Sequence, residues 1–355
     1  MRNMQRVVCF DDVLLTPQFS DVESRSTIDL SPPGFDTLRV RLTAEHEELV
    51  CPVVGSPMDT VMGPQSAALL ADLGGFGVLH RYCTVQESVE MFLTASGLTR
   101  SGTSVKNIMV AIGATGDYME RTDALFSAGC RAFCVDVAHG HHIHVKNSVT
   151  ALRKKFDRKI HIMSGNVSTL EAFNDLAEWG VDSVRVGVGG GSMCTTRIRT
   201  GHGVPTLQSV LDCARSHHDV LIVADGGVRN SGDAVKALAA GADMVMLGSV
   251  LAGHDESPGA LVVKDGHKFK KFRGMASREA QLEWRGRSSV VEGESTLVPY
   301  KGSMTDTVTD LLEGVRSGLS YSGARSIREL RSRAKFVHIT PNSTRENGPH
   351  GKTMP

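Results

Sequence analysis

The sequence lacks an excess of charge of either sign. Lysine plus arginine and aspartate plus glutamate each number 39, so the formal net charge of the 355 residues is zero. Proteins that bind nucleic acid or anionic membrane surfaces normally carry a surplus of basic residues, which attracts phosphate groups. The even balance predicts no nucleic acid and no membrane as partner, and it favours a small molecule or a protein.

Long apolar runs and paired cysteines are also missing. No run approaches the roughly 20 apolar residues that cross a bilayer, and the start MRNMQRVVCFDDV lacks the apolar core of a signal peptide. The seven cysteines contain no CxxC pair, which favours reduced thiols over disulfides. These absences predict a cytoplasmic protein in which most cysteines are small buried hydrophobic residues.

Eight short apolar runs, rich in β-branched residues, recur along the chain. They are CPVVGSPM, GGFGVLHR, IMVAIGAT, AFCVDVAHG, IHIMSGNV, SVRVGVGG, VLIVADGG and MVMLGSVLAG, with ends near positions 55, 80, 113, 137, 165, 188, 225 and 248. Runs without polar alternation are typical of parallel strands buried on both faces. Between them, stretches such as TLEAFNDLAEWG and GDAVKALAAGAD have the apolar spacing of helices. Eight strand–helix units predict an α/β fold, a (β/α)8 TIM barrel.

We expect residues 1–355 to form a single barrel domain with three additions. An N-terminal extension covers residues 1–50, in which FDDVLLTP predicts a strand or a plug at one barrel end. A flap-like excursion covers residues 253–303, and loops of that length usually act as lids or carry small elements of their own. The polar tail, residues 338–355, is expected to be disordered or ordered by a neighbouring subunit. No inserted second domain is visible.

The barrel prediction also locates the chemistry, because barrel enzymes place their active sites at the carboxyl ends of the strands. Polar or glycine-rich strand ends occur at Ser56, Asp59, His80, Arg81, Asp136, His139, Asn166, the loop 187–196, Asp225–Gly227 and Gly248–Ser249. The loops after the last two strands, ADGG and LGS, have the small residues that let main-chain amides converge on a phosphate. Asp225 is better suited to accept hydrogen bonds from ribose hydroxyls, so a phosphorylated sugar is implied.

Two clusters leave alternatives open on the residues alone. In GVGGGSMCTT, residues 187–196, Cys194 is either a reactive thiol, with Thr196 placed to pass a proton, or an inert one. His139, His141, His142 and His144 form either a metal site or the polar start of a helix. Their spacing fits no common zinc pattern, which favours the helix start.

Several motifs together resemble the IMP dehydrogenase/GMP reductase family. They are VRVGVGGGSMCTTR, VADGGVRNSGDAVKALAAGADMVMLGSVLAGHDESPG, FRGM, VPYKG and FDDVLL, and the likeness runs from about residue 8 to residue 340. The resemblance implies an oxidoreductase that acts on purine 5′-monophosphates with a nicotinamide cofactor. It also implies a (β/α)8 barrel, usually a homotetramer, in agreement with the strand count.

The family's functional residues carry over where the motifs match. Cys194 resembles the nucleophile that attacks C2 of the purine, and Thr196 and Glu292 resemble its proton-relay pair. The positions that hold the nucleotide's phosphate, ribose and base match Ser192, Asp225, Gly227, Gly248, Ser249, Gly274 and Met275. The region beside the nicotinamide matches Asp136, Val137 and Ala138, and a potassium-binding loop matches the carbonyls of Gly189, Gly191 and Cys194.

The resemblance covers two activities that share a covalent thioimidate at C2. A reductase displaces ammonia from GMP and uses NADPH to give IMP, whereas a dehydrogenase oxidises IMP with NAD and needs water to release XMP. Dehydrogenases resemble one another in carrying a mobile flap with an Arg-Tyr pair, and most contain inserted CBS-type regulatory modules. Only 22 residues, 276–297, separate Met275 from Val298, and they contain no Arg-Tyr pair. The short span, and the missing modules, favour the reductase.

Other details keep the dehydrogenase as the alternative. LGSVLAG, VDVAHGHH and RSGLSYSGARSIREL are closer to dehydrogenases, and Ser289 stands where reductases place an arginine. A shortened flap in which Trp284 and Arg285 replace the Arg-Tyr pair is a further alternative. From a different class, an FMN-binding or a non-catalytic nucleotide-binding barrel would use similar phosphate loops. The sequence thus predicts GMP reductase with NADPH, with IMP dehydrogenase and NAD as the alternative.

Overall fold

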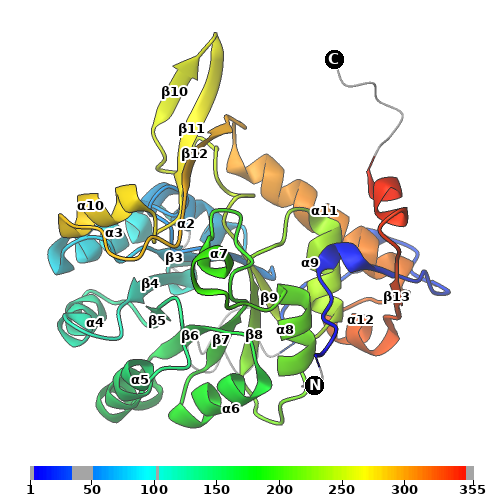
Figure 1. Ribbon diagram of the computed structural model, residues 1–355, viewed down its shortest axis with the longest axis horizontal. Coiled ribbons are helices and arrows are strands. Elements are labelled where there is room, and N and C mark those ends of the chain that lie inside the picture. Colours follow the sequence, from blue (N-terminus) through cyan, green and yellow to red (C-terminus); the bar gives the residue numbers. More distant parts are fainter. Residues whose placement is uncertain (1–3, 34–50, 101–103, 349–355) are drawn as a thin grey trace.

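Eight parallel strands close into a barrel in the computed structural model, which describes residues 4–33, 51–100 and 104–348 (Figure 1). The strands are β2 (Val53–Gly55), β3 (Phe76–Leu79), β4 (Ile108–Ile112), β5 (Ala132–Asp136), β6 (His161–Val167), β7 (Ser183–Val186), β8 (Leu221–Asp225) and β9 (Met244–Leu247). Each pairs with the next, and β2 pairs with β9 to close the ring. Every strand ends within two residues of its predicted position, so the predicted (β/α)8 barrel is confirmed.

Side chains pack on both faces of the barrel wall, which explains why the strands show no polar alternation. The barrel interior is filled by a cluster that includes Phe76, Met109, Met163 and Met246, all with almost no exposed surface. The opposite faces of the same strands pack against the surrounding helices in a larger cluster. Burial on both faces removes the selection for alternating polar residues, as expected for a parallel sheet.

Helices surround the barrel in the order that the sequence repeat predicts (Figure 1). They are α2 (Pro64–Asp72), α3 (Val85–Leu98), α4 (Tyr118–Ser127), α5 (Ile143–Phe156), α6 (Leu170–Trp179), α8 (Thr206–Cys213), α9 (Ser231–Ala239) and α11 (Met304–Tyr321). The side chain of Thr169 caps the start of α6, and Gly180 ends it in a left-handed conformation. Two shorter helices are α7 (Thr196–Thr200) and α12 (Ile327–Arg333).

The two ends of the described chain pair with each other. FDDVLLTP forms a strand, β1 (Val13–Leu15), but it does not enter the barrel; it pairs antiparallel with β13 (Phe336–His338). The described part of the tail contains the end of β13 and a turn of 3-10 helix (Ser343–Asn347), and its ordering by a neighbouring subunit stays a prediction. Residues 34–50 of the extension and 349–355 of the tail lie outside the described residues.

The excursion carries elements of its own. Strands β10 (Leu261–Lys264), β11 (His267–Arg273) and β12 (Ser295–Pro299) form an antiparallel sheet that projects beyond the barrel (Figure 1), and α10 (Arg278–Arg285) joins β11 to β12. The base of the sheet is anchored by Lys270, whose buried ammonium donates to the carbonyls of His254 and Ser257. These contacts fix the excursion to the barrel. They place α10 and residues 286–294 at the carboxyl ends of the barrel strands. Within the described residues, no helix is long and apolar enough to cross a membrane.

Candidate active site

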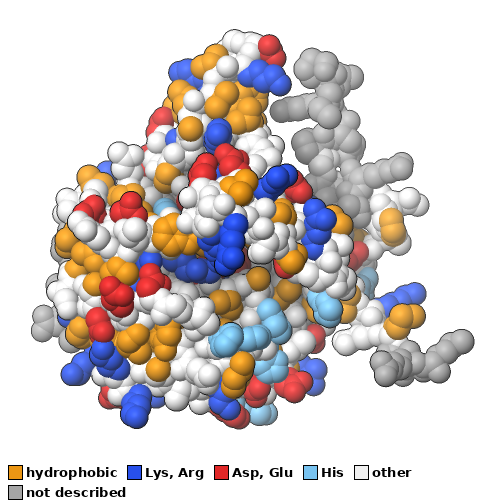
Figure 2. All heavy atoms as spheres, turned by 60° about the vertical axis from the view of Figure 1, so that its left-hand side comes forward, with side chains coloured by type: hydrophobic (Ala, Val, Ile, Leu, Met, Phe, Trp, Pro, Cys, Tyr) orange, Lys and Arg blue, Asp and Glu red, His pale blue; other side chains and the backbone are white. Residues whose placement is uncertain are grey.

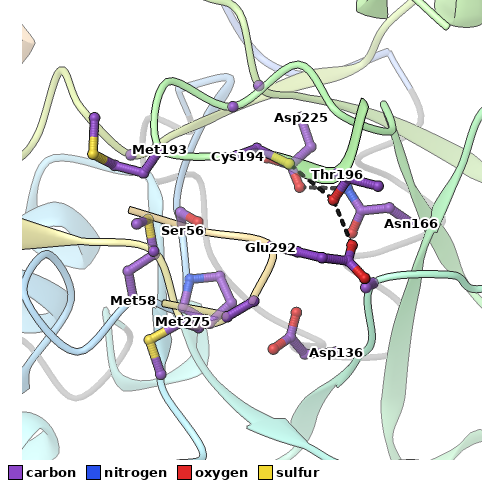
Figure 3. A pocket seen from close by; sticks show the side chains of 18 of the residues that line it. Ser56, Met58, Asp136, Asn166, Met193, Cys194, Thr196, Asp225, Met275 and Glu292 are labelled. Carbon is purple, nitrogen blue, oxygen red and sulfur yellow. Dashed lines mark hydrogen bonds between the residues drawn. The ribbon is translucent and has the colours of Figure 1, made fainter. Parts of the chain in front are cut away.

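A cavity of about 460 Å³ opens at the carboxyl ends of the barrel strands (Figure 3). Every residue that the family resemblance assigns to the site lines it: Asp136, Val137, Ala138, Gly189, Gly191, Ser192, Cys194, Thr196, Asp225, Gly227, Gly248, Ser249, Gly274, Met275 and Glu292. These residues come from strand ends and loops spread over more than 150 positions of the sequence. The fold therefore brings the residues assigned by the resemblance to one place. Of the other strand-end candidates, Asp59, His80 and His139 are not part of the cavity lining.

The loop that carries Cys194 is shaped by glycines. Gly187 and Gly189 have φ angles of 141° and 78°, in a region that side chains rarely adopt. On the neighbouring strand end, a Cβ on Gly226 would lie 2.9 Å from the main-chain nitrogen of Gly191. The ADGG loop and the cysteine loop can pack this closely only because both lack side chains at the contact. Cys194 then ends a tight turn in which its amide donates to the carbonyl of Gly191 over 3.0 Å.

A chain of hydrogen bonds runs from the thiol to a carboxylate (Figure 3). The Sγ of Cys194 donates to Oγ1 of Thr196 over 3.2 Å, and Oγ1 of Thr196 donates to Oε2 of Glu292 over 2.7 Å. All three side chains are only partly exposed. A hydroxyl that accepts from one group and donates to another can pass a proton between them. The arrangement can therefore move a proton between the sulfur and a carboxylate that lies 96 residues away in the sequence.

Main-chain hydrogen bonds hold Glu292 against the cysteine loop. The carbonyl of Glu292 accepts from the amide of Thr195 over 2.9 Å, and the amide of Glu292 donates to the carbonyl of Ala276 over 3.2 Å. Further along the same segment, the amide of Glu294 donates to the carbonyl of Met193 over 3.0 Å. The segment thus runs between the cysteine loop and the residues after β11, as an added strand would.

A buried arginine joins the two carboxylates of the site. Arg185, on β7, donates to Oδ1 of Asp136 and to Oδ2 of Asp225, over 2.5 and 2.8 Å. Asn166 also donates to Oδ2 of Asp225, over 2.7 Å, so within the described residues Oδ1 of Asp225 has no hydrogen-bond partner and can accept from a ligand hydroxyl. Burial would raise the pKa of Asp136, but the charges of Arg185 and Arg81 outweigh it and hold that pKa below its ordinary value.

Sequence reasoning missed Arg185, although a signal was present. The run SVRVGVGG places one arginine inside an otherwise apolar strand, and its side chain is 6% exposed in the structure. A buried guanidinium requires anionic partners, and the neighbouring strand ends Asp136 and Asp225 were the available ones. A lone arginine in a buried strand therefore predicts an ion pair at the barrel mouth.

The comparisons with known proteins decide the family. The family model described as the IMP dehydrogenase/GMP reductase domain matches residues 7–350. The chain belongs to the IMP dehydrogenase/GMP reductase family. The predicted family, and with it the enzyme class of oxidoreductases that act on purine monophosphates, is confirmed.

The relatives include proteins named for each of the two activities. A GMP reductase from Vibrio cholerae is 36% identical over 353 residues, covering 97% of each chain. An IMP dehydrogenase from Nitrosopumilus maritimus is 32% identical over 473 aligned positions, covering 96% of this chain and 97% of that one. Because this alignment is longer than 355 residues, that relative contains a segment with no counterpart here.

Among solved structures, a similar one is a cysteine-to-alanine variant of GMP reductase from Trypanosoma brucei in complex with guanosine 5′-monophosphate. It superposes with a TM-score of 0.86 at 29% identity, and 99% of each chain is covered.

Within this family member, the short flap region is attached to the barrel. Trp284, on α10, stacks on Tyr82 with ring centroids 6.1 Å apart, and the guanidinium of Arg285 lies 5.8 Å from the centre of the same ring. The ion pair between Arg273 and Glu283 adds a charged contact of 2.6 Å. Trp284 and Arg285, the suggested substitutes for a mobile Arg-Tyr pair, are thus both in contact with Tyr82.

The histidine cluster begins a helix. His142 is the N-terminal cap of α5, and its Nδ1 accepts from the amide of His144 over 3.1 Å. His141 bonds to Asp175 over 2.7 Å and stacks on Trp179. Figure 2 shows histidine side chains gathered on one face of the molecule. The cap of α5 supports the helix-start interpretation, and no group of three or more metal-binding side chains occurs among the described residues.

We expect Arg185→Met to destabilise the protein by about 3–5 kcal/mol, because it leaves two carboxylates without their shared cation. Chemical denaturation at neutral pH measures the loss. The pKa of Asp136 is lowered in the folded state, so the stabilisation is present above the unfolded pKa of about 3.9 and is lost as pH falls through the lowered value. Arg185→Met should therefore lose less stability on acidification than the native protein does.

Arg185→Lys is the matched control for this prediction. It keeps the positive charge but cannot donate to both carboxylates in a fixed fork, so its stability should lie between the other two. Equal stability of the native protein and Arg185→Met would contradict the account of the ion pair.

Proposed function

We propose that this protein is a GMP reductase, which converts GMP to IMP and ammonia with NADPH through a thioimidate on Cys194. The observation that carries the proposal is the hydrogen-bond chain from Cys194 through Thr196 to Glu292, next to a flap region that is short and attached to the barrel. The GMP reductase relatives, one of them crystallised with GMP, support the same activity.

The nucleotide is assigned to the cavity by the chemistry of its lining. Main-chain amides at Gly227 and Gly248, with the hydroxyls of Ser192 and Ser249, are suited to hold the phosphate. The free carboxylate oxygen of Asp225 is suited to accept from ribose hydroxyls. Gly274 and Met275 then border the purine, whose C2 faces the sulfur of Cys194.

The chemical steps follow from the groups on this chain. The proton of the Cys194 thiol passes through Thr196 to Glu292, and the thiolate sulfur attacks C2 of GMP, forming a carbon–sulfur bond. The bond between C2 and the exocyclic nitrogen breaks, and Glu292 returns the proton through Thr196 to the departing ammonia. Once the hydride has been added at C2, the carbon–sulfur bond breaks and IMP leaves, and the Cys194 thiolate takes up a proton from solvent to restore the thiol.

The residues beside the sulfur fit a nicotinamide cofactor. Asp136, Val137 and Ala138 line the same cavity as Cys194, and we assign the nicotinamide ring to them. Bound NADPH supplies the hydride that replaces sulfur at C2. Arg185 and Arg81 keep Asp136 ionised and in place, as a hydrogen-bond acceptor beside the ring.

Potassium, the homotetramer and the cytoplasmic location remain predictions. The carbonyl of Gly191 accepts from the amide of Cys194 but keeps a second lone pair, so with the carbonyls of Gly189 and Cys194 it can contribute to a cation site. Turnover measured with potassium and with a large organic cation in its place tests that site. Light scattering on the purified protein tests the tetramer.

IMP dehydrogenase with NAD is the second candidate, favoured by the dehydrogenase relatives and the LGSVLAG motif. One assay separates the two: the protein is given GMP with NADPH, then IMP with NAD, and the near-ultraviolet absorbance of the reduced cofactor is followed. We expect absorbance to fall with GMP and to stay constant with IMP. Formation of XMP in the second reaction would show that the protein is an IMP dehydrogenase and not a GMP reductase. A yellow protein would instead indicate the FMN-binding barrel.

A further inference from the structure

A buried glutamine lies behind the segment that carries Glu292. Gln281, on α10, is 4% exposed and borders the active-site cavity. Its Nε2 donates to the carbonyls of Ala276 and Val290, over 3.0 and 3.1 Å. Its Oε1 accepts from the amide and the hydroxyl of Ser289, over 2.8 and 3.3 Å. All four hydrogen-bonding positions of the amide are therefore used.

The amide of Gln281 binds both strands of main chain that meet at Glu292: the carbonyl of Ala276, to which the amide of Glu292 donates, and residues just before Glu292. The carbonyl of Ala276 accepts from Nε2 of Gln281 and also from the amide of Glu292. Ser289 and Val290 lie just before Glu292 in the sequence, separated from it only by Val291, and Val290 is 64% exposed. In the described part of the chain, no other side chain hydrogen-bonds to the main chain of residues 287–291. Gln281 is thus the side chain that ties this exposed connection to the rest of the site.

The helix that carries Gln281 is itself attached to the barrel. The Trp284–Tyr82 stack and the Arg273–Glu283 ion pair connect α10 to the ends of β3 and β11. α10 and the amide of Gln281 therefore fix Ser289 and Val290 relative to the barrel. These two residues in turn fix the main chain that leads to Glu292. The carboxylate of Glu292 then reaches Thr196 at 2.7 Å (Figure 3).

We propose that Gln281 is a positioning residue for the proton relay, which holds the main chain before Glu292 so that its carboxylate stays bonded to Thr196. The inference rests on the proposed function, because it assigns Gln281 to the step in which ammonia leaves GMP. The side chain acts through Glu292 and does not touch the reacting atoms. It should therefore affect the rate of ammonia release and leave the affinity for GMP unchanged.

The test is Gln281→Met, which keeps the length of the side chain and removes the four hydrogen bonds. The native protein and the variant are mixed with GMP without cofactor, and the covalent adduct on Cys194 is followed by rapid quenching and mass measurement. We expect adduct formation to slow by about 10- to 100-fold, as small displacements of a catalytic group do. The dissociation constant of GMP should change by less than about twofold, which is much less than the change in the rate of adduct formation. Gln86→Met is the matched control, because Gln86 is an exposed helical glutamine bonded to Glu90.

The same substitution in a Glu292→Gln background separates positioning from a general structural role. If Gln281 acts through Glu292, Gln281→Met has no further effect in that background. An equal slowing in both backgrounds, an unchanged adduct rate in the single variant, or a loss confined to GMP affinity would each overturn the inference. Gln281→Glu, which keeps the acceptor for Ser289, provides the second variant if the methionine protein does not fold. Absence of any adduct in the native protein would refute the proposed function instead.

Discussion

Cys194→Ala is expected to lower turnover of GMP by about 10⁵-fold or more, as loss of a catalytic nucleophile does. In the proposed mechanism the sulfur forms the bond to C2, and neither Thr196 nor Glu292 can replace it because both are assigned only to moving the proton. GMP binding should persist, since the phosphate and ribose are assigned to other residues. Steady-state kinetics and calorimetric titration with GMP measure the two effects.

Cys9→Ala is the matched control, because Cys9 is also a partly exposed free thiol but lies outside the cavity. It should keep native activity. Turnover by Cys194→Ala at more than a few per cent of the native rate would rule out the covalent route.

Glu292→Gln is expected to slow ammonia release by about 10²- to 10⁴-fold, the usual contribution of a positioned general acid. The amide can still accept the hydrogen bond from Thr196, but it cannot take up the thiol proton and return it to the leaving nitrogen. Hydride transfer, which needs no proton from this group, should change less. Single-turnover kinetics resolve the two steps.

Glu294→Gln serves as the control for this second prediction, because Glu294 is an exposed carboxylate two residues away. It should behave as the native protein does. Equal slowing of both chemical steps in Glu292→Gln would mean that the carboxylate maintains the site and does not act as the acid.

The barrel could be predicted from the sequence because burial on both faces leaves short, continuous apolar strands that recur along the chain. The place of Cys194 and of the loops assigned to the phosphate followed from the strand ends, since parallel strands deliver their carboxyl ends to one side of the barrel. FDDVLLTP was recognised as a strand or a plug, but its partner, residues 336–338, could not be found, because a three-residue antiparallel pair leaves no sequence signal.

The partner of Thr196 could not be derived from spacing. Glu292 lies 96 residues away, and its position depends on hydrogen bonds made by main-chain groups, which are the same for every sequence. It was identified only through the family motif. Gln281 was missed for a related reason: a glutamine in a helix is ordinarily solvated, and only the structure shows that its amide is buried and fully bonded. Arg185, by contrast, carried a readable signal in its apolar strand.

The most direct test of the account is the mass of the intact protein after incubation with GMP in the absence of NADPH. If Cys194 displaces ammonia, the protein gains the mass of GMP less that of ammonia, the gain maps to the peptide with Cys194, and free ammonia appears in equal amount. Cys194→Ala shows no gain. An unmodified native protein that still reduces GMP when NADPH is added would contradict a covalent reductase mechanism.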